Sequence, residues 1–370
     1  MKNRIDQLFA VTAPGLESVC AEELALLGLT NRIVPGGVEF SGGLREIYLT
    51  NLWLRCSSRI LVRWEEFRCR DFPALYRKAL LLPWGRYLKK ETPLKIRVTC
   101  HRSRLQHTGR IAETLRQAAD RALGRASSDL AAESDQWLMV RMEDDVCRLS
   151  VDSSGELLHR RGYREDIGPA PMRETLAAGI LRLLQWNGGV PLVDPMCGSG
   201  TFPIEAALLA GHYAPGSRRS FAFMKWPRYR PGLWQALLNE ASSSALEVET
   251  LIAGSDCDNL VVAAAARNAE RAGVRGKIVL SRAELGELQP VEGPGLVLCN
   301  PPYGTRLGCD RELVSLYRRL GKTCRESFKG WRFAMICPDP NLAKATGIPL
   351  RQLSMLRNGG IEVALLTGDL

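Results

Sequence analysis

The chain has 370 residues, 45% of them apolar and 24% charged, and carries a formal net charge of +10. This length suits two or three domains with ordinary cores. The absence of any apolar stretch of ~20 residues excludes a membrane-spanning helix. Excess positive charge favours a polyanionic partner, and nucleic acid is the commonest of these.

The cysteines and the N-terminus bear on the compartment. Eleven cysteines are scattered along the chain, no Cys-x-x-Cys pair occurs, and there are only four histidines. This pattern argues against a disulfide framework and against a structural zinc site, so we expect no metal. Residues 1–6 are not followed by the apolar region of a signal peptide. We therefore expect a cytoplasmic protein.

Residues 1–65 predict a small α+β domain of the ferredoxin-like kind, because strands and helices alternate within a short stretch. The helix expected after the first strand has apolar residues at helical spacing and ends at Gly28. No catalytic constellation is found here, which favours a scaffold or an RNA-orienting role. The expected strands are 8–12, 37–41 and 59–67, and the expected helices are 16–27 and 44–54.

Residues 66–155 predict a second α+β unit in which a polar loop leads into a helix. Basic and hydroxyl side chains at a helix entrance suit phosphate contacts. The histidines are alternatively surface or helix-capping residues. The expected elements are helices 72–81 and 110–123, a strand at 94–100, and a hairpin of 137–141 with 146–151. The candidate RNA contacts are Arg102, Ser103, Arg104, His107, Thr108 and Arg110.

A glycine-rich turn follows the predicted strand 190–193 and precedes the predicted helix 204–209. Strand, turn and helix form the geometry of a nucleotide-cofactor loop. The glycine spacing is that of neither a dinucleotide fingerprint nor an ATP-binding loop. Asp194 at the strand end suits a cationic group of a cofactor. The candidate cofactor-binding residues of this loop are Asp194, Pro195, Cys197, Gly198, Gly200 and Thr201.

The next predicted strand, 251–256, ends in Asp256, which is placed to accept hydrogen bonds from ribose hydroxyls. Asp258 is a weaker candidate, because it could equally cap the helix predicted at 259–272. Strands alternate with helices through this segment, so residues 156–370 predict a doubly wound, mostly parallel α/β sheet. The remaining expected strands are 277–280, 295–299, 331–337 and 361–366.

The strand 295–299 runs into Asn300-Pro301-Pro302-Tyr303-Gly304. Two consecutive prolines cannot continue a sheet ladder, so a stiff loop holds Asn300 at the carboxyl edge of the sheet. The Asn300 side-chain oxygen and the Pro301 carbonyl then form two acceptors that suit the NH₂ group of a base. The alternative is a tight turn that needs proline and glycine.

Basic and aromatic residues interleave in residues 216–231. Such a segment suits stacking and phosphate contacts near a nucleic-acid site. The alternative, slightly favoured, is a surface loop that packs Phe221, Phe223 and Trp226 onto the sheet.

Two motifs resemble those of class I S-adenosylmethionine-dependent methyltransferases that act on exocyclic amino groups. Residues 194–202 are similar to the cofactor loop of that class, and residues 300–303 to its catalytic motif. Residues 102–108 resemble the THUMP RNA-binding domain. Residues 159–164 and 170–178 resemble the entry to the catalytic domain of THUMP-linked guanine-N2 methyltransferases. The whole chain is most similar to the bacterial large-subunit (23S) rRNA guanine-N2 methyltransferases, in a short form with one catalytic domain.

The resemblance implies S-adenosylmethionine as cofactor and RNA as partner, with ferredoxin-like (1–65), THUMP (66–155) and methyltransferase (156–370) domains. Asn300, Pro301 and Tyr303 would be catalytic, with Tyr303 stacking on the flipped base and Asn300 also beside the cofactor. Family members often hold the adenine amine with an aspartate after the third strand. That contact falls here to Glu284 or to the Ala283 backbone. Arg164, Pro171 and Arg173 would close the cofactor or RNA side.

Three other functions remain open from the sequence. A tRNA guanine-N2 methyltransferase would share both halves of the chain, and a DNA adenine-N6 methyltransferase would share the Asn-Pro-Pro-Tyr chemistry. A non-catalytic RNA-binding protein of ribosome assembly would share the fold but not the catalytic activity. The retained Asp194, Asp256 and Asn300 argue against this last alternative.

Overall fold

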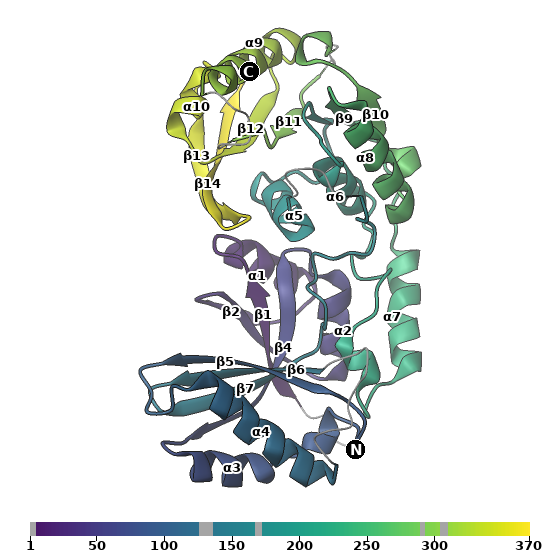
Figure 1. Ribbon diagram of the computed structural model, residues 1–370. Coiled ribbons are helices and arrows are strands. Elements are labelled where there is room, and N and C mark those ends of the chain that lie inside the picture. Colours follow the sequence, from purple (N-terminus) through teal and green to yellow (C-terminus); the bar gives the residue numbers. More distant parts are fainter. Residues whose placement is uncertain (1–4, 126–135, 167–171, 289–292, 304–309) are drawn as a thin grey trace.

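The structure is a computed structural model that describes residues 5–125, 136–166, 172–288, 293–303 and 310–370. Two seven-stranded sheets lie one beyond the other along an elongated molecule, with α3 and α4 near one end and α9 near the other (Figure 1). Across these described ranges, no helix has the length and apolarity to cross a membrane. Nor does any group of three or more metal-binding side chains gather within them.

The first sheet has the strand order β2-β3-β1-β4-β7-β6-β5. The long strand β4 pairs with β1 on one side and with β7 on the other, so the ferredoxin-like and THUMP-like units share one continuous sheet. The boundary expected near residue 65 lies inside β4. The elements are β1 (Asp6–Thr12), α1 (Glu17–Leu26), β2 (Asn31–Val34), β3 (Gly37–Gly42), α2 (Leu44–Trp53), β4 (Ser57–Arg68), α3 (Phe72–Leu80), β5 (Leu94–His101), α4 (Thr108–Leu123), β6 (Gln136–Glu143) and β7 (Val146–Asp152).

Most elements expected in this half are confirmed, and local sequence explains them. The strand β5 alternates buried and outward residues from Leu94 onward, as a half-buried strand does. The helix α4 starts where the His107 ring accepts the Arg110 N–H, and it ends at Gly124, whose φ is +60°. The short edge strand β2 was not expected.

The second sheet has the order β10-β9-β8-β11-β12-β14-β13, and its first five strands are parallel. This confirms the doubly wound, mostly parallel fold. The prediction of a strand from Lys277 was wrong at its start, because residues 275–277 form a 3₁₀ turn. The elements are α5 (Glu174–Leu183), β8 (Leu192–Asp194), α6 (Thr201–Ala210), α7 (Pro231–Ser243), β9 (Ile252–Asp256), α8 (Asn259–Ala272), β10 (Val279–Arg282), β11 (Leu296–Cys299), α9 (Asp310–Ser327), β12 (Arg332–Cys337), α10 (Pro340–Ala345), β13 (Arg351–Asn358) and β14 (Ile361–Asp369).

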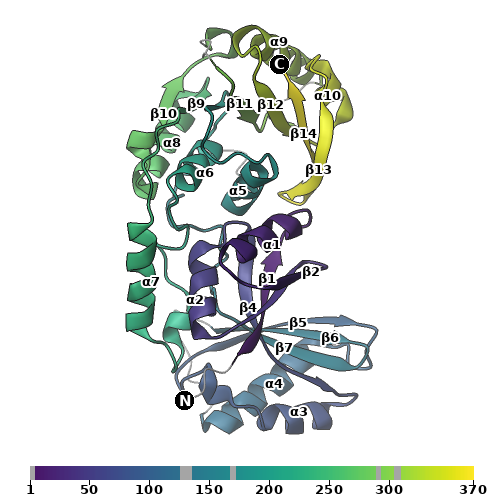
Figure 2. The ribbon, with the colours of Figure 1, turned by 180° about the vertical axis from the view of Figure 1, so that it is seen from behind.

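The basic, aromatic segment 216–231 belongs to the core of the first half. Phe221, Phe223 and Trp226 are at most 2% exposed, and the ring of Phe223 stacks on that of Tyr48 at a centroid distance of 4.3 Å. These aromatic side chains are therefore not free to stack on bases. The helix α7 follows them and runs beside α2, so this insertion fastens one half to the other (Figure 2).

Candidate active site

The carboxyl ends of β9, β8 and β11 meet at one edge of the second sheet. β8 pairs with β9 on one side and with β11 on the other, all in parallel. The chain passes from β8 through α6 to β9, whereas β11 lies on the other flank of β8, so the strand order reverses there. Ligands of open α/β sheets bind at such a switch point. The sheet thus brings Asp194, Asp256 and Asn300 to one edge, as expected.

Asp194 is a buried carboxyl at the end of β8. It is 2% exposed and accepts the Met196 N–H at 3.1 Å. Burial raises the pKa of Asp194 well above its ordinary value, and the nearby Asp256 carboxylate raises it further. Within the described ranges no cationic side chain pairs with it. An unpaired buried carboxylate is costly, so this site fits a ligand that brings positive charge.

The loop after Asp194 uses its two glycines differently. Gly198 has φ +50°, and a Cβ there would meet nothing within 4 Å, so its backbone lies open to approach by a ligand. Gly200 has φ +86°, and a Cβ there would lie 2.9 Å from the Ala265 Cβ of α8. Gly200 therefore allows close packing of α6 on α8. Pro195, Cys197 and Thr201 are buried in the same loop and at the start of α6.

Asp256 connects the loops after β8 and β9. One of its carboxylate oxygens accepts the Gly198 N–H at 3.0 Å, and the other accepts the Asp258 N–H at 3.1 Å. Asp258 itself caps α8 by accepting the Leu260 N–H at 2.8 Å, so the capping alternative describes its observed contact. Asp256 thus shapes the loop, and its expected contact with ribose stays a prediction.

The two candidates for the adenine contact already have partners. The Ala283 N–H donates to the Asp256 carbonyl at 3.1 Å, which leaves the Ala283 carbonyl as its remaining group. Glu284 is exposed and pairs with Arg282 at 3.3 Å. Both roles stay predictions.

Asn300 follows β11 with its side-chain oxygen buried. Within the described part of the chain, Asn300 Oδ1 has no hydrogen-bond partner. A buried acceptor without a donor costs about 1–3 kcal/mol, so it suits a site that receives an N–H from a ligand. The motif residue Gly304 lies outside the described residues.

Two side chains that sequence reasoning missed brace the Asn-Pro-Pro-Tyr turn. The Tyr317 hydroxyl of α9 donates to the Pro302 carbonyl at 3.3 Å, and Asn358 at the end of β13 donates to the Tyr303 hydroxyl at 2.7 Å. Tyr303 is half-buried and packs against two hydrophobic clusters of this half. Stacking on a base stays a prediction for Tyr303. A partly alternating pattern at 351–358 was the only sequence signal for the Asn358 strand.

Some of the RNA contacts predicted in the loop before α4 are exposed, and others are buried or already bonded within the protein. The side chains of Arg102, Arg104, Thr108 and Arg110 are exposed, and Arg102 pairs with Asp144 at 3.0 Å. Ser103 is a correction: it is 5% exposed and donates to the His101 carbonyl, so it holds the loop rather than RNA. His107 is exposed too, but its ring caps α4, as the capping alternative states.

Arg164 and Arg173, two further predicted RNA contacts, differ in exposure. Arg164 donates to the Met172 carbonyl and to the Thr201 hydroxyl, so it tethers the segment before α5 to the start of α6. Arg164 is half-buried, which corrects its prediction as an RNA contact and agrees with the alternative that it lies on the cofactor side. Arg173 is exposed at the start of α5. Pro171 lies outside the described residues.

A doubly wound sheet with a glycine-bearing loop after β8 and an Asn-Pro-Pro-Tyr turn after β11 defines a Rossmann-like methyltransferase domain. The chain belongs to the RMKL-like methyltransferase family, whose methyltransferase domain matches residues 161–362. The RlmL ferredoxin-like domain matches residues 7–61. Both matches confirm the expected family.

Relatives and solved structures agree with this assignment. The chain is 35% identical to slr0064 of Synechocystis sp., provisionally named an RNA methyltransferase, over 98% of this chain and 96% of that protein. It is 38% identical to the ribosomal RNA large subunit methyltransferase K/L of Methylococcus capsulatus, over 98% of this chain but 51% of that protein. The chain therefore spans about half the length of this second relative.

The solved structure of SMU.472, provisionally named a methyltransferase, contains SAH. It superposes with a TM-score of 0.90 at 31% identity and covers 100% of this chain and 99% of its own. The fold of the present chain is thus one that holds S-adenosylhomocysteine in a relative.

Proposed function

We propose that this chain transfers a methyl group from S-adenosylmethionine to the exocyclic N2 amine of a guanine in RNA, with large-subunit rRNA as substrate. The observation that carries the proposal is the buried Oδ1 of Asn300 at the switch point, where the Asp194 carboxyl also lies; among the residues that the structure describes, Oδ1 has no donor and Asp194 has no cationic partner. The names of the Synechocystis and Methylococcus relatives support RNA and rRNA respectively. The exposed arginines before α4 support a polyanion.

The residues of the chain hold the amine rather than attack it. Asn300 Oδ1 and the Pro301 carbonyl accept its two N–H bonds, which turns the nitrogen lone pair toward the methyl group. S-adenosylmethionine, when bound, supplies that methyl on a sulfonium. A neutral amide accepts without competing for the positive charge, and the Asn358 and Tyr317 contacts keep the turn rigid. This is catalysis by positioning and fixed dipoles.

The experiment that tests the proposal offers three substrates to one enzyme. The chain is incubated with methyl-labelled cofactor and naked large-subunit rRNA, tRNA or DNA, and the labelled nucleoside is identified by mass spectrometry. We expect N2-methylguanosine from rRNA. N2-methylguanosine from tRNA alone would show that tRNA, not rRNA, is the substrate. N6-methyladenine in DNA would show that the enzyme methylates a different base. No transfer to any of the three would contradict an enzymatic function and favour a non-catalytic RNA-binding protein.

Binding of the cofactor should depend on pH through Asp194. The pKa of this buried carboxyl is raised in the free protein, and a cationic ligand lowers it again. Binding therefore releases a proton near that raised pKa, and affinity rises as the pH rises through it. Calorimetry in two buffers of different ionisation enthalpy measures the release.

The matched variant is Asp194→Asn, which keeps the side chain's size and removes the titrating group. Its affinity should be lower than wild type at neutral pH and flat with pH. An unchanged pH dependence in this variant would remove Asp194 from contact with the cofactor's positive charge.

A further inference from the structure

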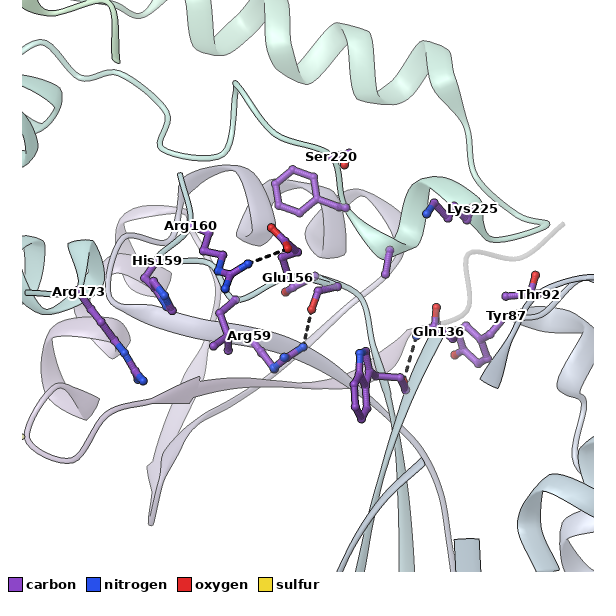
Figure 3. A pocket seen from close by; sticks show the side chains of 16 residues that line it. Arg59, Tyr87, Thr92, Gln136, Glu156, His159, Arg160, Arg173, Ser220 and Lys225 are labelled. Carbon is purple, nitrogen blue, oxygen red and sulfur yellow. Dashed lines mark hydrogen bonds and ion pairs between the residues drawn. The ribbon is translucent and has the colours of Figure 1, made fainter. Parts of the chain in front are cut away.

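A cavity of about 570 Å³ lies in the first half of the molecule, outside the residues assigned to the active site (Figure 3). Six separate parts of the chain line it: β4, the segment before β5, the start of β6, the segment that leaves β7, the start of α5, and the insertion before α7. The volume falls in the ~300–1,000 Å³ range of ligand pockets. The lining residues used below are Arg59, Trp137, Glu156, His159, Arg160, Arg173 and Lys225.

The walls of this cavity are fixed in place by the chain itself. Arg59 pairs with the fully buried Asp152 and donates to the Gly155 carbonyl at 2.6 Å. The Arg219 guanidinium donates to three carbonyls of the segment 156–160, at 2.7–2.9 Å. The Phe223 N–H donates to the Ser153 carbonyl at 3.0 Å, which joins the insertion to the segment after β7. Such a cavity is preorganised, so a ligand entering it orders few side chains.

The charge of the lining is strongly positive. It holds the cations Arg59, Arg160, Arg173 and Lys225 against the single acid Glu156. Arg160 pairs with Glu156 at 3.0 Å, and Arg59 with Asp152 behind the wall.

Arg173 and Lys225 are exposed, and neither side chain makes a hydrogen bond or ion pair to any residue that the structure describes. Two free cations therefore remain. Figure 3 shows them at opposite ends of the cavity, with His159 near Arg173.

Burial and the nearby arginines together lower the pKa of His159, which lines the cavity. Burial, with Arg173, Arg161 and Arg160 adding to it, lowers the pKa of His159 to about 4. The ring is therefore neutral at physiological pH and can donate one hydrogen bond and accept another. A neutral donor between two free cations suits an anion that extends along the cavity rather than a point charge.

We propose that this cavity binds a single-stranded segment of the RNA substrate, with successive phosphates running from Arg173 to Lys225 and a base against Trp137. The half-buried Trp137 contributes an aromatic face, and such faces stack bases without sequence preference. This inference rests on the proposed function and adds a second place where the substrate is held, away from Asn300.

The test uses charge reversal in the full-length chain. Lys225→Glu and Arg173→Glu are compared with Lys329→Glu, an exposed lysine just after α9 that also lacks a partner within the described residues. The probe is a fluorescent single-stranded RNA of about 10 nucleotides, and anisotropy gives its Kd at several salt concentrations. Each cavity variant should weaken binding about tenfold and lower the salt slope by about 0.7, whereas Lys329→Glu should match wild type.

Two further measurements make the outcome decisive. The circular dichroism spectrum and the thermal unfolding midpoint should match wild type in all three variants, which shows that they are folded. Wild-type Kd and slope in both cavity variants would overturn the proposal, and so would displacement of the probe by millimolar inorganic phosphate. If the wild type fails to methylate RNA while the two reversals still weaken binding, the proposed function falls and this binding site stands.

Discussion

Replacing Asn300 with alanine should lower the rate of methyl transfer to RNA by about 10²–10³-fold, with little change in the Kd of S-adenosylmethionine. The reason is geometric: Oδ1 is a buried acceptor that finds no donor in the described part of the chain, and alanine removes it. An acceptor that acts on the reacting amine affects kcat more than cofactor binding. Single-turnover transfer of labelled methyl and calorimetric titration of the cofactor measure the two effects separately.

Two other substitutions separate this role from a loss of folding. Asn300→Asp keeps an oxygen acceptor at the same place and should fall between alanine and wild type. Asn239→Ala removes an exposed amide on α7 and should keep wild-type activity. Full activity of Asn300→Ala on rRNA would show that the amine is held by other groups.

The sequence was sufficient to predict which polar residues lie at the carboxyl edge of the second sheet, because its signals there are local. A strand that runs into two prolines must end, and parallel strands end at the same edge, so Asn300 and Asp194 follow from chain order alone. The same reasoning missed β13, whose Leu353 and Met355 are 43% and 45% exposed and so blur the alternation. It also divided the first sheet at residue 65, because the pairing of β4 with β7 joins residues about 90 positions apart.

The basic cavity could not be predicted in this way. Its walls come from β4, the segment before β5, β6, the segment after β7, the start of α5 and the insertion before α7, which no periodicity connects. The insertion was recognised as basic and aromatic, but its side chains divide by burial: Phe223 and Trp226 enter the core, whereas Lys225 faces the cavity. Only the tertiary structure shows that the aromatic side chains are buried in the core and that the lysine lines the cavity.

A buried ionic cluster joins the first half of the molecule to α6, the helix that follows the cofactor loop. Glu205 of α6 is fully buried, accepts the Tyr163 hydroxyl at 2.9 Å, and lies 3.6 Å from the Arg161 guanidinium. Arg55 donates to the Leu208 carbonyl at 3.1 Å, and burial lowers its pKa to about 10. The cluster thus holds α6, and with it the loop after β8, in place against the first half of the molecule.

Replacing Glu205 with alanine should lower the free energy of unfolding by about 3–5 kcal/mol, because the buried guanidinium groups of Arg55 and Arg161 lose a buried carboxylate that offsets their charge. Urea unfolding followed by circular dichroism, with the midpoint and slope compared with wild type, measures the loss. Glu205→Gln keeps the volume and an acceptor for Tyr163, so it should cost less than alanine.

The control is Glu326→Ala, which breaks an exposed pair with Lys322 on α9 and should change stability by no more than about 0.5 kcal/mol. A Glu205→Ala protein as stable as this control would mean that water or a rearranged side chain screens the two arginines. A loss in Glu205→Ala far larger than in Glu205→Gln would assign most of the cost to the cavity and the lost hydrogen bond. Similar losses in both would assign it to the missing charge, since charge is the property that both variants remove.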